Sequence, residues 1–259
     1  MTPSEDGTDL ALRPAIPEDA APLADLFVAA REAAYPAMPR PVHSADEIHG
    51  WFTGLVGSDG TRETWVAEQA GELSGYLVLD PEWLDSLYVR PDLVGRGVGS
   101  VLLDLAKSLR PGGFALWVFE SNERARRFYA RHGLWELERT DGSANEERCP
   151  DVRMAWVGER PLDYLRRQIN EVDEDLSRLL ARRAALTAAA QQHKRVPGHA
   201  GRDRGREAEI AARMARHAPA LGEARLSRIM DAVITASLDA ADEPSPPAAD
   251  EQGRTGAVG

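Results

Sequence analysis

The chain has 259 residues, of which 43% are hydrophobic and 28% are charged, and its net charge is −11. This length suffices for one large or two ordinary domains, and the acidic balance argues against nucleic acid as a general partner. No run of about 18 consecutive apolar residues predicts a membrane span, and the single cysteine, Cys149, excludes an internal disulfide. The polar N-terminus lacks the pattern of a signal peptide, so we expect a cytoplasmic protein.

The chain up to about residue 158 mixes the periodicities of strands and helices. Apolar runs predict strands at residues 10–16, 63–69, 73–80, 83–89, 113–119, 134–140 and 151–157. Apolar residues at helical spacing predict a helix within residues 17–35, and further helices follow the strands that end at residues 89 and 119. Strands that alternate with helices indicate an α/β or α+β fold, and residues 1–9 are expected to be disordered.

The segment Val94–Lys107, VGRGVGSVLLDLAK, follows a predicted strand and opens a helix. Gly95, Gly97 and Gly99 carry no side chains where backbone N–H groups converge on the helix N-terminus. Such N–H groups, together with the helix dipole, bind a pyrophosphate. A glycine-rich turn without a ligand gives the same pattern, so this run alone leaves both interpretations open.

A second motif, ESNERARRFYARHGL at residues 120–134, follows the next strand and carries Asn122 and Tyr129. With the glycine turn, this order resembles the GNAT superfamily of acetyl-CoA-dependent N-acetyltransferases over residues 10–157. The resemblance implies an α+β fold with a mixed, splayed sheet, Tyr129 as general acid toward the departing thiolate, and Asn122 as a coenzyme contact. The implied acetyl-CoA pyrophosphate site consists of Val94, Gly95, Arg96, Gly97, Val98, Gly99 and Ser100.

No motif names the acetyl acceptor. An amine must lose a proton to attack a thioester, so a carboxylate near the splayed strands would serve as the base. Asp85, within WLDSLYV at residues 83–89, is the candidate; the open alternative is a carboxylate that faces solvent or pairs with an arginine. Val94 stands where the family usually has Gln or Arg, which removes one polar contact to the coenzyme.

The second half of the chain has no strand pattern. Residues 162–194 show helical spacing of apolar residues without a proline, and Pro161 fits the first turn of a helix. We therefore expect a first domain at residues 10–158, a helical domain at 159–241 and a disordered tail at 242–259. The apolar phase of the long helix comprises Leu165, Ile169, Val172, Leu176, Leu179 and Leu186.

Two cations share that apolar phase and are expected to face the core. Arg183 lies seven residues after Leu176, and Lys194 lies eleven residues after Arg183, which is about 16 Å along the helix. Because a buried unpaired charge is unfavourable, both side chains reach solvent, pair with carboxylates of another helix, or hold a small anion. Arg166 lies about 25 Å from Arg183 on a straight helix, so it serves that site only from a second chain.

The stretch RDRGRE at residues 202–207 opens the next helix, and a last helix runs from Arg225 with Ile229, Val233 and Ser237 on one face. Residues 162–241 resemble the all-helical chorismate mutases of the AroQ class. The resemblance implies a three-helix all-α domain that forms a homodimer, binds the chorismate dianion and needs no metal or cofactor. The implied site consists of Arg166 from the partner chain, Arg183, Lys194, Asp203, Arg206, Glu207 and Ser237.

Three residues depart from this family pattern. Arg202 and Arg204 match no family position, and we expect both to be solvated. Ala241 stands four residues after Ser237, where the family usually carries a Gln or Glu that donates to the ether oxygen. The leading hypothesis is a bifunctional acetyltransferase and chorismate mutase. The alternatives are action on 4-amino-4-deoxychorismate or isochorismate, and a regulatory protein that binds acetyl-CoA or chorismate-like anions without turnover.

Overall fold

The computed structural model describes residues 10–56, 60–194 and 198–242. The chain divides after Arg167 into two compact units. The segments expected to be disordered lie outside the described residues, except for Asp242, which ends the last helix. Cys149 is a free thiol. In the part of the chain that the structure describes, none of the helices has the length and apolar character needed to cross a bilayer.

Two antiparallel sheets form the first unit and contain the seven strands that the sequence predicts. Each strand bound agrees with the prediction to within two residues. The four-stranded sheet has the order β1 (Ala11–Pro14), β2 (Glu63–Gln69), β3 (Glu72–Leu79) and β4 (Leu84–Val89), and the three-stranded sheet has the order β5 (Phe114–Phe119), β7 (Asp151–Trp156) and β6 (Trp135–Thr140).

The two sheets meet where β4 approaches β5. Within the described ranges, one isolated parallel bridge, between Trp83 and Ala115, links them, and the Ala115 N–H donates to the Glu82 carbonyl oxygen at 2.9 Å. Beyond Leu84 the two strands do not pair, so their side chains line a common opening instead of a continuous sheet. The mixed, splayed sheet that the sequence resemblance implies is therefore confirmed.

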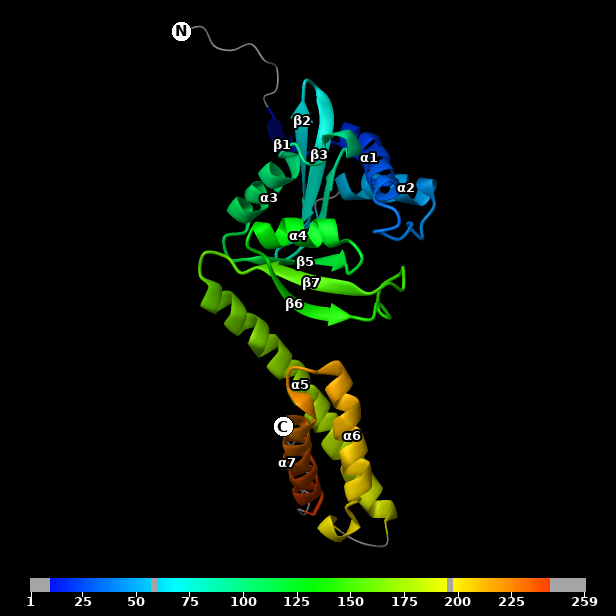
Figure 1. Ribbon diagram of the computed structural model, residues 1–259, viewed down its shortest axis with the longest axis vertical. Coiled ribbons are helices and arrows are strands. Elements are labelled where there is room, and N and C mark those ends of the chain that lie inside the picture. The colour runs from blue at the N-terminus through cyan, green and yellow to red at the C-terminus, as the bar shows by residue number, and fades with distance from the viewer. Residues whose placement is uncertain (1–9, 57–59, 195–197, 243–259) are drawn as a thin grey trace, which may run out of the picture. The chain divides into compact units, whose positions relative to one another are not determined.

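Helices cover both faces of the four-stranded sheet (Figure 1). α1 (Ala20–Ala33) and α2 (Ala45–Val56) lie on one face, and α3 (Val98–Leu109) lies on the other. α4 (Glu123–Arg131) follows β5 and shares the core of α3. The fully buried side chains include Leu23, Phe52 and Tyr76 on the first face and Leu77 and Leu102 on the second, where Met154 of β7 joins the same core.

Sequence analysis did not predict α2. Its start is fixed by a reciprocal contact between Ser44 and Glu47: the Ser44 backbone N–H and hydroxyl each donate to the Glu47 carboxylate at 2.8 Å, and the Glu47 N–H donates to the Ser44 hydroxyl at 3.3 Å. This capping box is visible in the sequence as SADE just before an apolar run, and it is the signal that would have found the helix.

The long helix α5 (Pro161–His193) begins at the predicted proline. Its Tyr164 is 3% exposed and packs against Ala115 and Ala155 of the first unit. The ring lies so close to Gly113 that a Cβ there would approach it to 2.5 Å. Because Tyr164 belongs to this core, the first compact unit extends to Arg167 rather than ending at the expected residue 158.

The three expected helices are present: the second unit contains α5 from Gln168 onward, followed by α6 (Arg204–His217) and α7 (Gly222–Asp242). The expectation that the apolar phase of α5 faces the core is wrong for the single chain, because five of its side chains are 50% to 63% exposed: Ile169, Val172, Leu176, Leu179 and Leu186. The half-buried side of this part of α5 is formed by Arg183, Ala184, Thr187 and Ala188.

Candidate functional sites

A cleft of about 1220 Å³ opens where β4 and β5 separate. Five of the seven residues of the expected pyrophosphate site line it, namely Val94, Gly95, Gly97, Gly99 and Ser100. Arg96 is exposed outside this lining, and the Val98 side chain is buried in the core, so Val98 has only its backbone to offer a ligand.

The glycine turn has the backbone geometry of an anion site. Gly95 and Gly97 have φ values of +92° and +94°, a conformation that L side chains rarely adopt. Gly97 is the N-cap of α3, and no atom lies within 4 Å of the place that a Cβ would take there. The first N–H groups of a helix have no intrahelical partner, so those of Val98 and Gly99 remain available to a negatively charged group.

Tyr129 lies on α4 and lines the cleft with 8% of its surface exposed. Burial raises the pKa of its hydroxyl well above the ordinary value for tyrosine. The hydroxyl therefore stays protonated at neutral pH. Asn122 also lines the cleft, and its side-chain oxygen accepts the Ala125 N–H at 3.1 Å and caps α4.

His132 is a cleft residue that sequence analysis missed. Its Nδ1 lies 2.9 Å from the Phe128 carbonyl oxygen, and its Nε2 lies 3.0 Å from Ser100 Oγ. Because a carbonyl can only accept, Nδ1 carries a proton, and in the neutral ring Nε2 accepts the Ser100 hydroxyl proton. The histidine thus fixes Ser100 at the start of α3. Ser100 and His132 are 32 residues apart in sequence, so no local motif predicts their contact.

Asp85 lies on β4 and lines the same cleft, with its side chain open to solvent. The walls of the cleft exclude part of the surrounding water and raise the pKa of the carboxyl; Asp80 adds to this effect, and Arg62 opposes it. A carboxylate with a raised pKa takes up a proton more readily, which suits a general base. Both alternatives considered from the sequence are partly realised, since Asp85 reaches solvent and has an arginine nearby.

A buried ion pair adjoins this part of the cleft. Arg31 Nη2 lies 2.7 Å from Glu147 and 2.9 Å from the Pro39 carbonyl oxygen, and the two side chains are 7% and 17% exposed. Both residues line the cleft. The pair holds the loop after α1 against the loop between β6 and β7. The sequence gives no signal for it, because the two residues are 116 positions apart.

In the second unit, Arg183 and Ser237 are brought together. Arg183 Nη1 donates to Ser237 Oγ at 2.7 Å and to the Val233 carbonyl oxygen at 3.3 Å. Ser237 is 6% exposed, and its hydroxyl donates to the same carbonyl at 2.6 Å. The expected arginine therefore faces α7 from α5.

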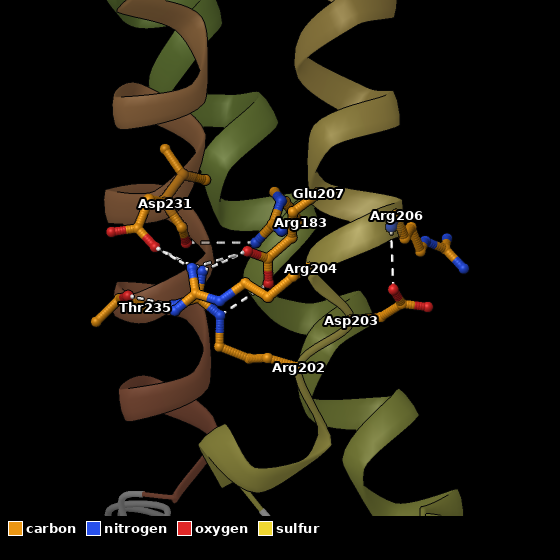
Figure 2. Close-up of polar contacts among 9 residues, drawn as sticks. Arg183, Arg202, Asp203, Arg204, Arg206, Glu207, Asp231 and Thr235 are labelled. Atoms are coloured by element: carbon orange, nitrogen blue, oxygen red, sulfur yellow. Dashed lines mark hydrogen bonds and ion pairs between the residues drawn. The ribbon is translucent and has the colours of Figure 1, made fainter. Parts of the chain in front are cut away.

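The expectation that Arg202 is solvated is wrong. Its side chain is 11% exposed and forms the centre of an ionic network (Figure 2). Nε and Nη2 donate to the two Glu207 oxygens at 2.8 and 2.7 Å, Nη2 donates to Asp231 at 2.6 Å, and Nη1 donates to Thr235 Oγ1 at 3.1 Å. Hydrogen bonding to Arg202 lowers the pKa of the Glu207 carboxyl. Arg204 is 76% exposed, as expected.

The two arginines approach α7 along different rows of residues. Arg202 contacts Asp231 and Thr235, and Arg183 contacts Val233 and Ser237. Each pair is four residues apart and shares a face of the helix, and the two rows are offset by two residues, or about 200° around the axis. α7 is therefore held by a guanidinium on each of two sides.

The remaining expected mutase residues do not join these contacts. Asp203 caps α6 by accepting the Arg206 N–H at 3.0 Å, and Figure 2 shows both residues away from the Arg202 network. Lys194 is exposed rather than core-facing, with Nζ 3.4 Å from the Gly201 carbonyl oxygen. Arg166 is exposed on α5. Among the described residues, no cluster of side chains suitable for holding a metal ion occurs.

Comparison with known proteins matches each unit to a family. The model of the acetyltransferase (GNAT) family matches residues 23–134, and the model of chorismate mutase type II matches residues 165–241. A peptidyl-lysine N-acetyltransferase of Escherichia coli, YjaB, is 33% identical over 95 residues, which cover 36% of this chain and 64% of that protein. A GCN5-related N-acetyltransferase structure from Rhodopseudomonas palustris is 26% identical, covers 60% of this chain and 99% of that one, and has a TM-score of 0.49.

These matches differ in how much of each relative they span. The chain covers 64% of the Escherichia coli YjaB and 48% of the Salmonella typhimurium YjaB, to which it is 37% identical over 71 residues, 27% of this chain. It covers 77% of an uncharacterized N-acetyltransferase of Archaeoglobus fulgidus, with 31% identity over 115 residues, 39% of this chain. The chain therefore belongs to the GNAT family of acetyltransferases, and its helical second unit carries a chorismate mutase type II domain.

Proposed function

We propose that the chain is a bifunctional enzyme. Its first unit transfers an acetyl group from acetyl-CoA to an amine, and its second unit converts chorismate to prephenate. The observation that carries the first assignment is a single cleft lined by the glycine turn, Asp85 and Tyr129. The second assignment is supported by the family match over residues 165–241 together with the contact between Arg183 and Ser237.

The residues of the cleft supply what acetyl transfer requires. The open space at Gly97 and the first N–H groups of α3 fit a pyrophosphate, and the coenzyme supplies the activated acetyl group as a thioester. Asp85 accepts a proton from the amine as its nitrogen bonds to the acetyl carbon. Tyr129 donates its proton to the sulfur as the C–S bond breaks. Asn122 and Ser100 stand along the coenzyme side of the same cleft.

A screen of amines tests this assignment with the full chain. Acetyl-CoA is incubated with each amine, and free thiol is measured. The name of the Escherichia coli relative makes a lysine-containing peptide the first acceptor to try. Thiol release that depends on the amine supports acetyl transfer. Acetyl-CoA binding without release for any amine would instead favour a coenzyme-sensing regulatory protein.

The chemistry of the second unit needs cations rather than a nucleophile. The rearrangement of chorismate breaks one C–O bond and forms one C–C bond within one molecule, without proton transfer. The enzyme therefore holds the dianion in a compact shape and stabilises the charge that develops on the ether oxygen. In our proposal Arg183 and Ser237 bind a carboxylate, and the exposed ammonium of Lys194 contacts the ether oxygen. Glu207, which Arg202 holds in place, is assigned to the ring hydroxyl.

The second unit also carries the features of a homodimer in this proposal. The exposed apolar side chains of α5, defined above from Ile169 to Leu186, form a stripe that a second copy of the helix would cover. Arg166 lies seventeen residues before Arg183 on α5, a separation of about 25 Å. A two-fold pairing of these helices brings Arg166 of one chain to Arg183 of the other.

Mixed dimers test this arrangement. Arg166→Ala chains and Arg183→Ala chains should each lose most of their mutase activity, and an equal mixture after subunit exchange should recover about a quarter of the wild-type sites. Recovery follows because one site of each mixed dimer contains both arginines. Activity is measured as loss of chorismate absorbance. A monomer by light scattering at micromolar concentration, or no recovery after verified exchange, contradicts the arrangement.

Ala241 provides a prediction of increased activity. It ends the row of α7 that holds Ser237, and it is too short to donate to the ether oxygen. Ala241→Gln should raise kcat for chorismate about tenfold, with a smaller change in KM, because the new donor acts mainly in the transition state. Prephenate formation is measured for the wild type and the variant.

Ala240→Gln is the matched control. It introduces the same side chain at an exposed neighbouring position, about 100° further around α7, and should leave kcat unchanged. A wild type that is already fast, or equal effects at both positions, contradicts the role given to residue 241. If neither wild type nor Ala241→Gln forms prephenate, chorismate is the wrong substrate, and 4-amino-4-deoxychorismate becomes the next one to test.

A further inference from the structure

A second, smaller hollow of about 270 Å³ adjoins the cleft of the first unit. It is lined by Asp80, Trp83, Leu84, Asp85 and Trp117, of which Leu84, Asp85 and Trp117 also line the main cleft. The hollow and the cleft therefore share a wall. Asp85, the base in the proposed acetyl transfer, stands where the two spaces meet.

Two indole rings form the apolar wall of this hollow. The Trp83 and Trp117 ring centroids are 6.3 Å apart, and their planes are within 13° of parallel. Trp117 is 44% exposed, so a large aromatic face meets solvent beside the hollow. The Arg153 guanidinium carbon lies 5.2 Å from the Trp83 ring centroid, so one indole of the pair already contacts a cation and the exposed Trp117 ring is the one left for a ligand.

The polar wall is negatively charged. Asp80 and Asp85 both face the hollow. The Asp80 carboxylate pairs with Arg62, whose Nε lies 3.2 Å from Asp80 Oδ2, and Arg110 Nε donates to the Asp80 backbone carbonyl oxygen at 3.0 Å. The Arg62 side chain is 41% exposed and lies outside the lining of the hollow. Neither arginine lines the hollow, so the charged groups of its lining are the two carboxylates. An anionic ligand would meet two carboxylates here, whereas a cation with an apolar stem would satisfy both walls.

We propose that this hollow is the acceptor subsite and that it takes a cationic alkylamine that carries no carboxylate. The alkyl stem and ammonium lie against the indoles of Trp83 and Trp117 beside Asp80. The ammonium releases one proton to solvent, and the resulting amine loses a second proton to Asp85 as it attacks the thioester. Two classes of amine are disfavoured: arylamines, which carry no charge at neutral pH, and free amino acids, whose carboxylate meets Asp80 and Asp85. The inference rests on the proposed acetyltransferase activity.

Matched acceptors test the charge preference with the full chain and saturating acetyl-CoA. The cationic probe is Nα-acetyl-lysine amide, the carboxylate-bearing probe is Nα-acetyl-lysine, and the neutral probe is aniline. We expect kcat/KM from thiol release to fall about tenfold from the amide to the acid, because repulsion from two nearby carboxylates in a part-solvated site is of that order. Aniline should be poorer still. Equal or reversed rates overturn the proposal.

Variants of the hollow test which residues select the acceptor. Trp117→Leu keeps an apolar side chain but removes the aromatic face, and Asp80→Asn keeps the shape but removes the charge. Each should raise KM for Nα-acetyl-lysine amide about tenfold with a much smaller change in kcat. Asp80→Asn should also reduce the difference in kcat/KM between Nα-acetyl-lysine amide and Nα-acetyl-lysine. Trp135→Leu, at a 66% exposed tryptophan on β6, is the control and should change neither constant.

Binding without turnover separates this inference from the proposed function. Nα-acetyl-lysine amide is titrated into the full chain by calorimetry in the absence of acetyl-CoA. Binding that Trp117→Leu and Asp80→Asn weaken, without thiol release for any amine, would sustain the subsite while the acetyltransferase proposal fails. Thiol release that is unaffected by both variants would sustain acetyl transfer and overturn the subsite.

Discussion

Replacing Gly97 by valine should weaken acetyl-CoA binding by about 100-fold, the equivalent of losing about one strong hydrogen bond to a charged group. The loss has two physical sources. Gly97 has φ +94° at the N-cap of α3, a conformation that valine resists. The space that its side chain would fill is empty in the protein and is the space that a pyrophosphate would enter. Calorimetric titration of the full chain with acetyl-CoA measures the effect.

Gly71 supplies the control for this variant. It lies in the turn between β2 and β3, has φ +80°, and also has no atom within 4 Å of the Cβ position. Gly71→Val therefore imposes similar backbone strain at similarly open space, away from the cleft. It should lower thermal stability as Gly97→Val does and leave acetyl-CoA affinity unchanged. Intact affinity in Gly97→Val would mean that the glycine turn binds no coenzyme.

Replacing Arg183 by alanine should lower kcat/KM for chorismate by about 100- to 1,000-fold, the range seen when one preorganised donor to a charged group is removed. Arg183 is half-buried and held by Ser237 and the Val233 carbonyl oxygen, so its guanidinium is already oriented before a substrate arrives. Preorganisation of this kind is what makes such a contact large. Loss of chorismate absorbance gives the rates, and far-ultraviolet circular dichroism checks that the helices persist.

Arg182→Ala is the matched control for this second prediction. It removes the same side chain one position earlier, from a residue that is exposed on α5. Because one residue turns the helix by about 100°, Arg182 does not share the side that meets α7. Its rate constant should stay within about twofold of the wild type. Comparable losses in both variants would indicate a general effect of charge rather than a binding contact.

Local patterns predicted most of the first unit, because its strands and glycine turn depend on neighbouring residues. All seven strands and the turn that opens α3 follow from periodicity and glycine spacing. The capping box at Ser44 and Glu47 is equally local and predicts the start of α2, but apolar periodicity alone does not reveal this helix. The contacts Arg31–Glu147 and Ser100–His132 could not be predicted from local sequence patterns, because the residues meet only through the tertiary fold.

In the second unit, sequence spacing predicts the helices but not which of their faces are buried. Spacing along α5 correctly placed its apolar residues on one face, and it could not say whether that face meets the chain's own helices or solvent. Arg183 and Ser237 were matched to the family and are in contact. Because Arg202 lies in a stretch of charged residues, it is predicted to be solvated. In the structure it is bound by Glu207 from α6 and Asp231 from α7. Glu207 lies within the same six-residue stretch, whereas Asp231 and Thr235 lie on another helix and are not visible in it.

The burial of Tyr164 bears on how the two domains of this chain can be separated by cloning. The chorismate mutase match begins at residue 165, and the first compact unit ends at Arg167, so the two parts overlap in sequence. A gene fragment that stops at residue 158 deletes the ring that covers Ala115, Ala155 and the backbone at Gly113, and it exposes that apolar surface to water. Soluble expression of an isolated acetyltransferase therefore requires the opening turns of the mutase helix.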